Sequence, residues 1–160
     1  MDDFQLALDA ALRFIACRPR SEHEIRRRLG RKAALPAATI EAVLARLRVA
    51  NLVDDAAFAR YWVDQRQTFR PRGPRLLRAE LRQRGVSGGL AASASEAAST
   101  TAEHDAYRAA RRKAAQLWAQ QLDERAFRTR LGQFLARRGF DWDTIQPTVA
   151  RLWREAQRAA

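Results

Sequence analysis

Residues able to carry out covalent or metal chemistry are few in this chain of 160 residues. Cys17 is the only cysteine, and His23 and His104 are the only histidines, so no internal disulfide and no zinc site of ordinary ligand spacing can be assembled. Asp54 and Asp55 are adjacent, and adjacent side chains on a helix do not face each other, so helix capping explains them better than acid–base chemistry. No glycine-rich phosphate loop, HExxH or GxSxG motif is present. We therefore predict a protein that is not an enzyme and uses neither a cofactor nor a metal.

Charge is the feature that does predict an interaction. The formal net charge is +12, and among the 30 basic residues only Lys32 and Lys113 are lysine. Guanidinium groups contact phosphate and carboxylate through two hydrogen bonds at once. A GC-rich genome would explain most of the preference for arginine over lysine, but it does not explain the net charge. We predict an anionic partner: nucleic acid, an acidic protein surface, or both.

The elements that must position these charges are predicted to be helices. No stretch alternates apolar and polar residues as a half-buried strand does. The first predicted helix, from about residue 3 to 17, places its larger apolar side chains on one face: Phe4, Leu8, Leu12 and Ile15. Ser21 and Glu24 have the spacing of a capping box. Residues 87–101 are small and polar with only Leu90 as a sizeable anchor, which predicts a short helix that is partly a linker.

One pattern recurs three times along the chain. Each copy pairs two apolar residues four positions apart: Ile25 with Leu29, Leu77 with Leu81, and Leu131 with Leu135. The copies are 52 and 54 residues apart, and each is preceded by a helix that bears an aromatic residue. We predict an all-α fold of three tandem three-helix repeats, at residues 1–52, 53–102 and 103–160, that form an elongated, curved array.

The positive charge is concentrated around the second helix of each predicted repeat. Residues 18–32 hold seven basic and two acidic groups, residues 60–84 hold eight and two, and residues 108–138 hold nine and two. One such run is usually a solvated face, but three of one sign favour an anionic contact surface. The predicted contact residues are Arg26, Arg27, Arg31, Lys32, Arg66, Arg70, Arg72, Arg75, Arg78, Arg82, Arg84, Arg111, Arg112, Lys113, Arg137 and Arg138.

The middle repeat has the sharpest charge pattern. At about 100° per residue, Arg75, Arg78 and Arg82 fall on one stripe opposite Leu77 and Leu81. The corresponding positions of the other repeats do not form such a stripe. Four tryptophans could stack on bases, but their helical spacing beside leucines predicts that most of them are core residues: Trp62, Trp118, Trp142 and Trp153. Trp142 is the exception in this pattern, because it is predicted to lie in a turn.

Several short segments, taken in order, carry a resemblance to a known family. They are Arg18–Ile25, Leu52–Ala59, Gly73-Pro74-Arg75, Glu80-Leu81, Arg84-Gly85 and Arg137–Phe140. Together they resemble the bacterial RecX regulatory proteins, from about Leu8 to Leu152. Two places depart from the family pattern. Ala33 replaces a glycine at the end of a helix, and the small residues 87–101 leave the packing between the second and third repeats open.

The resemblance implies three tandem three-helix repeats without catalytic residues. It also implies a regulator that binds the RecA filament on single-stranded DNA and inhibits the recombinase, ATPase and SOS co-protease activities of RecA. We expect a cytoplasmic monomer without membrane contact, because the chain has neither a signal peptide nor a bilayer-spanning apolar run.

The alternative is a basic helical module that acts directly on nucleic acid, with the Arg75–Arg82 helix in a DNA groove. Repeated copies argue against a single recognition helix, although weak direct DNA binding is compatible with either function.

Overall fold

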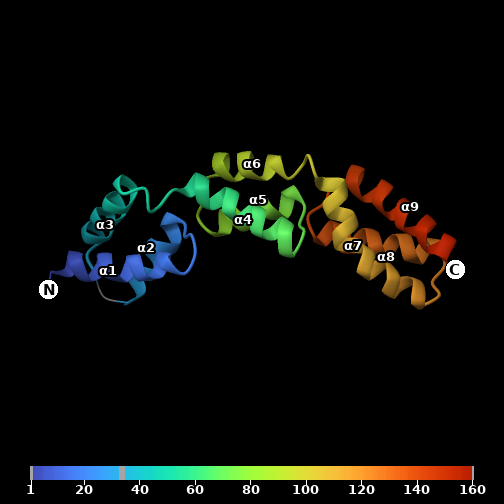
Figure 1. Ribbon diagram of the computed structural model, residues 1–160, viewed down its shortest axis with the longest axis horizontal. Helices are drawn as coiled ribbons and strands as arrows, with labels where there is room; N and C mark the ends of the chain where they lie inside the picture. The colour runs from blue at the N-terminus through green and yellow to red at the C-terminus, as the bar shows by residue number, and fades with distance from the viewer. Residues whose placement is uncertain (1, 33–34, 160) are drawn as a thin grey trace. The chain divides into compact units, whose positions relative to one another are not determined.

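The computed structural model describes residues 2–32 and 35–159, and in these ranges the chain forms nine α-helices and no β-strand (Figure 1). The helices are α1 (Asp3–Ala16), α2 (Glu22–Lys32), α3 (Ala37–Val49), α4 (Asp55–Phe69), α5 (Pro74–Gln83), α6 (Gly88–Ala97), α7 (Ala102–Ala119), α8 (Glu124–Arg137) and α9 (Trp142–Ala159). The all-helical prediction is confirmed. Ala33, where the sequence departs from the family pattern, lies outside the described residues.

The helix ends follow from local sequence. At the start of α2, the Ser21 hydroxyl accepts a hydrogen bond from the Glu24 amide at 3.1 Å, and the Glu24 carboxylate accepts one from the Ser21 amide at 3.2 Å. This is the predicted capping box. The Asp54 carboxylate caps α4 by accepting from the Ala56 amide at 2.8 Å. Gly139 ends α8 with a φ of 87°, in the left-handed region that glycine occupies without steric cost.

The described residues pack as two compact units, and the first contains the chain up to Trp62 together with Glu80–Ala91. Its main core lies between α1, α2 and α3, where Ile25 and Leu44 are fully buried. The predicted apolar face of α1 is partly wrong, because Leu12 is 37% exposed whereas Ala7 and Ala11 are buried. These small side chains let neighbouring helices approach closely, so the contact is centred on them and not on the leucine.

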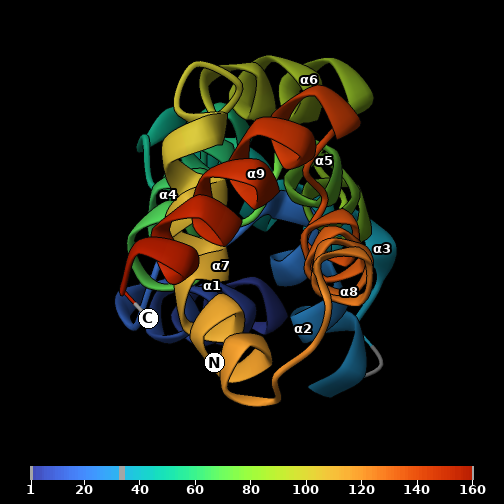
Figure 2. The same ribbon diagram turned by 90° about the vertical axis from the view of Figure 1, so that its right-hand side faces the viewer.

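The second compact unit contains Val63–Ala79 and the chain from Ala92 onward. Here α7, α8 and α9 lie against one another around a shared core (Figure 2). Phe127 and Leu131 of α8 are fully buried, and Trp153 of α9 packs its ring against Trp118 and Phe127 at centroid distances of 5.2 and 5.0 Å. Aromatic pairs in such tilted arrangements stabilise a core beyond the area that they bury.

The small, polar segment after α5 forms a complete helix of ten residues, α6. Leu90 does not anchor it, because this side chain is 36% exposed. The buried residues are Ala91 and Ser95, and Ala98 just after the helix, all at 1% exposure or less. Because these side chains are small, the sequence does not indicate that they anchor the helix. The helix is packed all the same.

Two equivalent junctions connect successive repeats, each inside one unit. The Ser21 hydroxyl donates to the carbonyl of Arg84 at 2.6 Å, and the Gly73 amide donates to the carbonyl of Arg138 at 2.8 Å. Ser21 and Gly73 hold the same place in their repeats, as do Arg84 and Arg138. At Gly73 the two backbones touch: a Cβ atom there would lie 2.2 Å from the carbonyl oxygen of Gly139. Only glycine fits this approach.

A buried carboxylate also connects the second and third repeats, between α4 and the start of α7. Asp105 is 4% exposed and accepts hydrogen bonds from the Thr101 hydroxyl at 2.8 Å and the Gln67 amide group at 3.2 Å. Arg108 continues the network, donating to the carbonyls of Gln67 at 3.0 Å and Thr68 at 3.2 Å. The packing between the second and third repeats, which the sequence left open, is thus specified by polar contacts.

Candidate partner-binding surface

The face of α5 opposite its core residues carries the predicted arginine stripe. Leu77 and Leu81 are fully buried, and Arg75, Arg78 and Arg82 are exposed. Two of these arginines also bond within the protein. Arg75 donates to the carbonyl of Ala136 at the end of α8, at 2.7 Å, and Arg78 lies 3.5 Å from the Ser95 hydroxyl. Arg82 makes no side-chain hydrogen bond or ion pair among the described residues, so it is the member most available to a partner.

The fold itself uses some of the predicted contact residues. Arg84 pairs with Glu24 at 2.7 Å and lies over the Trp62 ring at 3.7 Å from its centroid. Arg26 pairs with Glu41 at 2.7 Å, and this hydrogen bond raises the pKa of Arg26. Such arginines are positioned by internal partners, and their first role is to hold helices together.

Other predicted contact residues extend into solvent. Within residues 2–32 and 35–159, the following are exposed without an internal ion pair: Arg27 and Arg31 on α2, Arg70 after α4, Arg82 on α5, Arg111 and Arg112 on α7, and Arg137 on α8. Lys113 is half-buried, and the side chain of Lys32 lies outside the described part of the chain. The contact role of all these residues stays a prediction.

Four arginines come together where α4 ends and α8 ends. Burial and the charges of Arg66, Arg138 and Arg70 lower the pKa of Arg72. Burial and the charge of Arg70 lower the pKa of Arg138. Burial and like charges nearby both disfavour the charged form of these guanidinium groups, and Arg66 and Arg72 have further interactions within the protein. We call Arg66, Arg70, Arg72 and Arg138 the arginine cluster.

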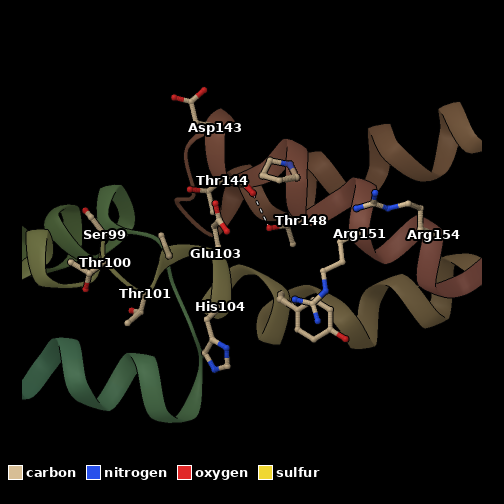
Figure 3. A pocket seen from close by; sticks show the side chains of 13 residues that line it. Ser99, Thr100, Thr101, Glu103, His104, Asp143, Thr144, Thr148, Arg151 and Arg154 are labelled. Carbon is tan, nitrogen blue, oxygen red and sulfur yellow. Dashed lines mark hydrogen bonds between the residues drawn. The ribbon is translucent and has the colours of Figure 1, made fainter.

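A polar groove of about 710 Å³ lies between the N-terminal turn of α7 and α9 (Figure 3). Figure 3 shows Glu103 and Asp143 toward one end and Arg151 and Arg154 toward the other. Arg151 lies over the ring of Tyr107 at 4.0 Å. Because its charges are mixed, this groove does not belong to the basic surface.

The residues with potential chemistry remain apart. No group of three or more His, Cys, Asp or Glu side chains that could hold a metal occurs in the described part of the chain. Cys17 is exposed at the end of α1. Asp55 caps a second helix, since its carboxylate accepts from the Glu22 amide at 2.9 Å. The capping function of Asp54 and Asp55 is confirmed.

Two exposed aromatic side chains were not predicted as surface residues. Phe69 is 74% exposed at the end of α4, and Trp142 is 64% exposed at the start of α9. Trp142, which the sequence placed in a turn, is the first residue of α9, whereas Trp62 and Trp153 are buried and Trp118 is half-buried. Both exposed rings lie at a helix end, where periodicity does not indicate which way a side chain points.

These features define an all-helical repeat protein with a strongly basic surface. Comparison with known families gives three matches: RecX, first three-helix domain, over residues 7–47; second, over 54–94; and third, over 103–149. The chain belongs to the RecX family.

Individual relatives agree with this assignment. The chain is 37% identical over 150 residues to the regulatory protein RecX of Prosthecochloris aestuarii, covering 94% of this chain and 95% of that protein. It is also 37% identical over 149 residues to the regulatory protein RecX of Geobacillus kaustophilus, covering 93% of this chain but only 55% of that protein. The chain thus spans about half the length of some relatives and nearly all of others.

Solved structures show the same fold. The crystal structure of RecX from Lactobacillus salivarius superimposes with a TM-score of 0.80 at 20% identity, over 94% of this chain and 97% of that one. A second crystal structure, of regulatory protein RecX, gives 0.76 at 23% identity, over 92% and 73%. Among the described residues, no helix is long and apolar enough to cross a membrane.

Proposed function

We propose that this protein regulates the RecA recombinase by binding the RecA filament on single-stranded DNA. In this proposal it inhibits the recombinase, ATPase and SOS co-protease activities of RecA. It acts in the cytoplasm as a monomer, through three repeats bounded at residues 52 and 102. The observation that carries the proposal is membership of the RecX family, whose relatives are named regulatory proteins.

The basic surface supports this proposal physically. Arginines without an internal ion pair are exposed on α2, α5, α7 and α8 among the described residues. A filament presents repeated phosphates and acidic side chains, so arginines distributed over several repeats can contact more than one of its subunits. Guanidinium groups are suited to both kinds of anion.

The competing function is a DNA-binding module that inserts α5 into a groove. Groove readers contact base edges with the N-terminal residues of the recognition helix. Here the N-terminal end of α5 is covered: Gly73 is buried against Gly139, and Arg75 bonds to the carbonyl of Ala136. This contact favours the filament regulator over a groove reader.

The direct test is DNA-dependent ATP hydrolysis by RecA as this protein is added. We expect inhibition at fewer than one copy per RecA subunit. An unchanged rate at a several-fold excess would refute the proposed function.

Variants can then locate the surface. Arg82→Ala, Arg111→Ala and Arg112→Ala, combined, remove three exposed contact candidates. A matched control removes three exposed arginines outside the predicted set: Arg46, Arg60 and Arg158. We expect the first variant to inhibit less than the control at the same helical content. Equal inhibition by the two would show that only total charge matters.

A further inference from the structure

A groove of about 380 Å³ lies where α5 meets the end of α8. It is lined by small or aliphatic residues and by one arginine from each helix: Arg75, Leu76, Ala79, Ala136, Arg137 and Gly139. The two segments approach closely because Gly139 has no side chain, and a Cβ atom there would lie 2.4 Å from the Cβ atom of Leu76. The apolar lining is therefore a product of the junction between two repeats and not of a single helix.

The two arginines of this groove carry charge that the fold does not neutralise. Arg75 donates to the carbonyl of Ala136 at 2.7 Å, and this uncharged acceptor fixes the position of its guanidinium group. Arg137 is exposed, and within residues 2–32 and 35–159 neither arginine forms an ion pair. Among the described residues that line the groove, none is acidic. A partner that is complementary to the groove therefore supplies negative charge next to an apolar group.

We propose that this groove binds an acidic segment of a partner protein, which places one apolar side chain on the aliphatic lining and carboxylates on Arg75 and Arg137. The inference rests on the proposed function, and it assigns the groove to the protein subunits of the filament and not to its DNA. Nucleic acid fits less well, because phosphates would satisfy the arginines but the lining has no aromatic ring on which a base could stack. A second copy of this chain also fits less well, because its formal net charge of +12 would bring like charges together.

The test follows the backbone amide signals of the isotopically labelled full chain by nuclear magnetic resonance during a peptide titration. The probe is a pentapeptide with one phenylalanine between two pairs of glutamates. We expect the amides of Leu76, Ala79 and Gly139 to shift until the groove is saturated. The same peptide with alanine in place of phenylalanine should bind roughly tenfold more weakly, because it has no ring to bury. Equal binding of the two peptides would show that charge alone attracts them, and this result overturns the inference.

Two pairs of variants locate the binding site. Ala79→Glu introduces a carboxylate into the groove and should weaken binding of the phenylalanine peptide at least roughly tenfold. Its control is Ala42→Glu, the same change at an exposed alanine that is also the sixth residue of its helix, α3. Arg137→Ala should weaken binding about threefold, with the exposed Arg60→Ala as its control. If either variant binds the peptide as its control does, the groove is not the binding site.

The same variants separate this inference from the proposed function. If the wild type binds the peptide in the groove but does not inhibit RecA, the function fails and the groove stands. If the wild type inhibits RecA and Ala79→Glu inhibits as strongly as Ala42→Glu, the function stands and the inference is overturned.

Two further results would assign the groove to another occupant. An oligothymidylate of about 30 nucleotides that shifts the groove amides at lower concentration than the peptide would show that nucleic acid binds there. Groove amides that shift with protein concentration alone would show that a second copy of the chain binds there. Either result overturns the inference.

Discussion

Replacing Gly73 by alanine should open the junction between α5 and the end of α8. The new Cβ would lie 2.2 Å from the carbonyl oxygen of Gly139 and 2.4 Å from the amide nitrogen of Phe140. Both atoms belong to the backbone, so no side-chain rotation can relieve the overlap. Overpacking of this kind costs about 1–3 kcal/mol. Separating the backbones also breaks the hydrogen bond from Gly73 to Arg138, worth about 0.5–1.5 kcal/mol. We therefore expect a loss of roughly 2–4 kcal/mol in unfolding free energy.

The assay is urea unfolding followed by far-ultraviolet circular dichroism, with Gly30→Ala as the matched control. Gly30 lies inside α2, and a Cβ there would meet nothing within 4 Å. Alanine should stabilise that position by about 0.5–1 kcal/mol because it lowers the conformational entropy of the unfolded chain. The two identical substitutions should thus move stability in opposite directions. A Gly73→Ala variant as stable as the wild type would refute the proposed close approach of the two backbones.

Three further predictions concern polar contacts. Ser21→Ala removes both the cap of α2 and the bond to the Arg84 carbonyl, so it should cost roughly 1–3 kcal/mol in urea unfolding, and Ser21→Thr should lose less. Asp105→Ala leaves the Thr101 and Gln67 donors without their acceptor and should cost roughly 2–3 kcal/mol; thermal unfolding at the wild-type midpoint would contradict this. The hydrogen bond from Arg48 lowers the pKa of Glu22, so this pair stabilises the fold at neutral pH, and the contribution is lost as the pH falls below 4.5 through the folded-state pKa. Glu22→Gln should therefore flatten the loss of stability in acid, and an unchanged acid profile would exclude this pair as its cause.

Local sequence predicted those parts of the fold that depend on neighbouring residues. The capping box at Ser21 and the buried leucines of α5 and α8 follow from spacing alone. The burial of Ala7 and the formation of α6 as a complete helix could not be predicted in this way. Small residues are buried only when another helix approaches closely, and that distance is a property of the tertiary structure.

The basic surface, too, could be predicted from the sequence only in part. Composition predicted a strong positive charge, but it could not separate arginines that hold the fold from arginines that face solvent. Arg84 pairs with Glu24, sixty residues away in the chain, and this removes it from the set available to a partner. Phe69 was missed because periodicity loses its meaning at the last residue of a helix.

The third repeat begins its second helix differently from the other two. Ile25 and Leu77 are the fourth residues of α2 and α5, whereas Leu131 is the eighth residue of α8, so α8 begins about one turn earlier. The place held by Ser21 and Gly73 is thereby taken by Phe127, which is fully buried and whose amide bonds to the carbonyl of Asp123 at 2.9 Å. In the first two repeats the corresponding donor, the Ser21 hydroxyl or the Gly73 amide, bonds to the end of a helix in the next repeat. One additional turn in α8 thus converts a donor between repeats into a donor within a helix.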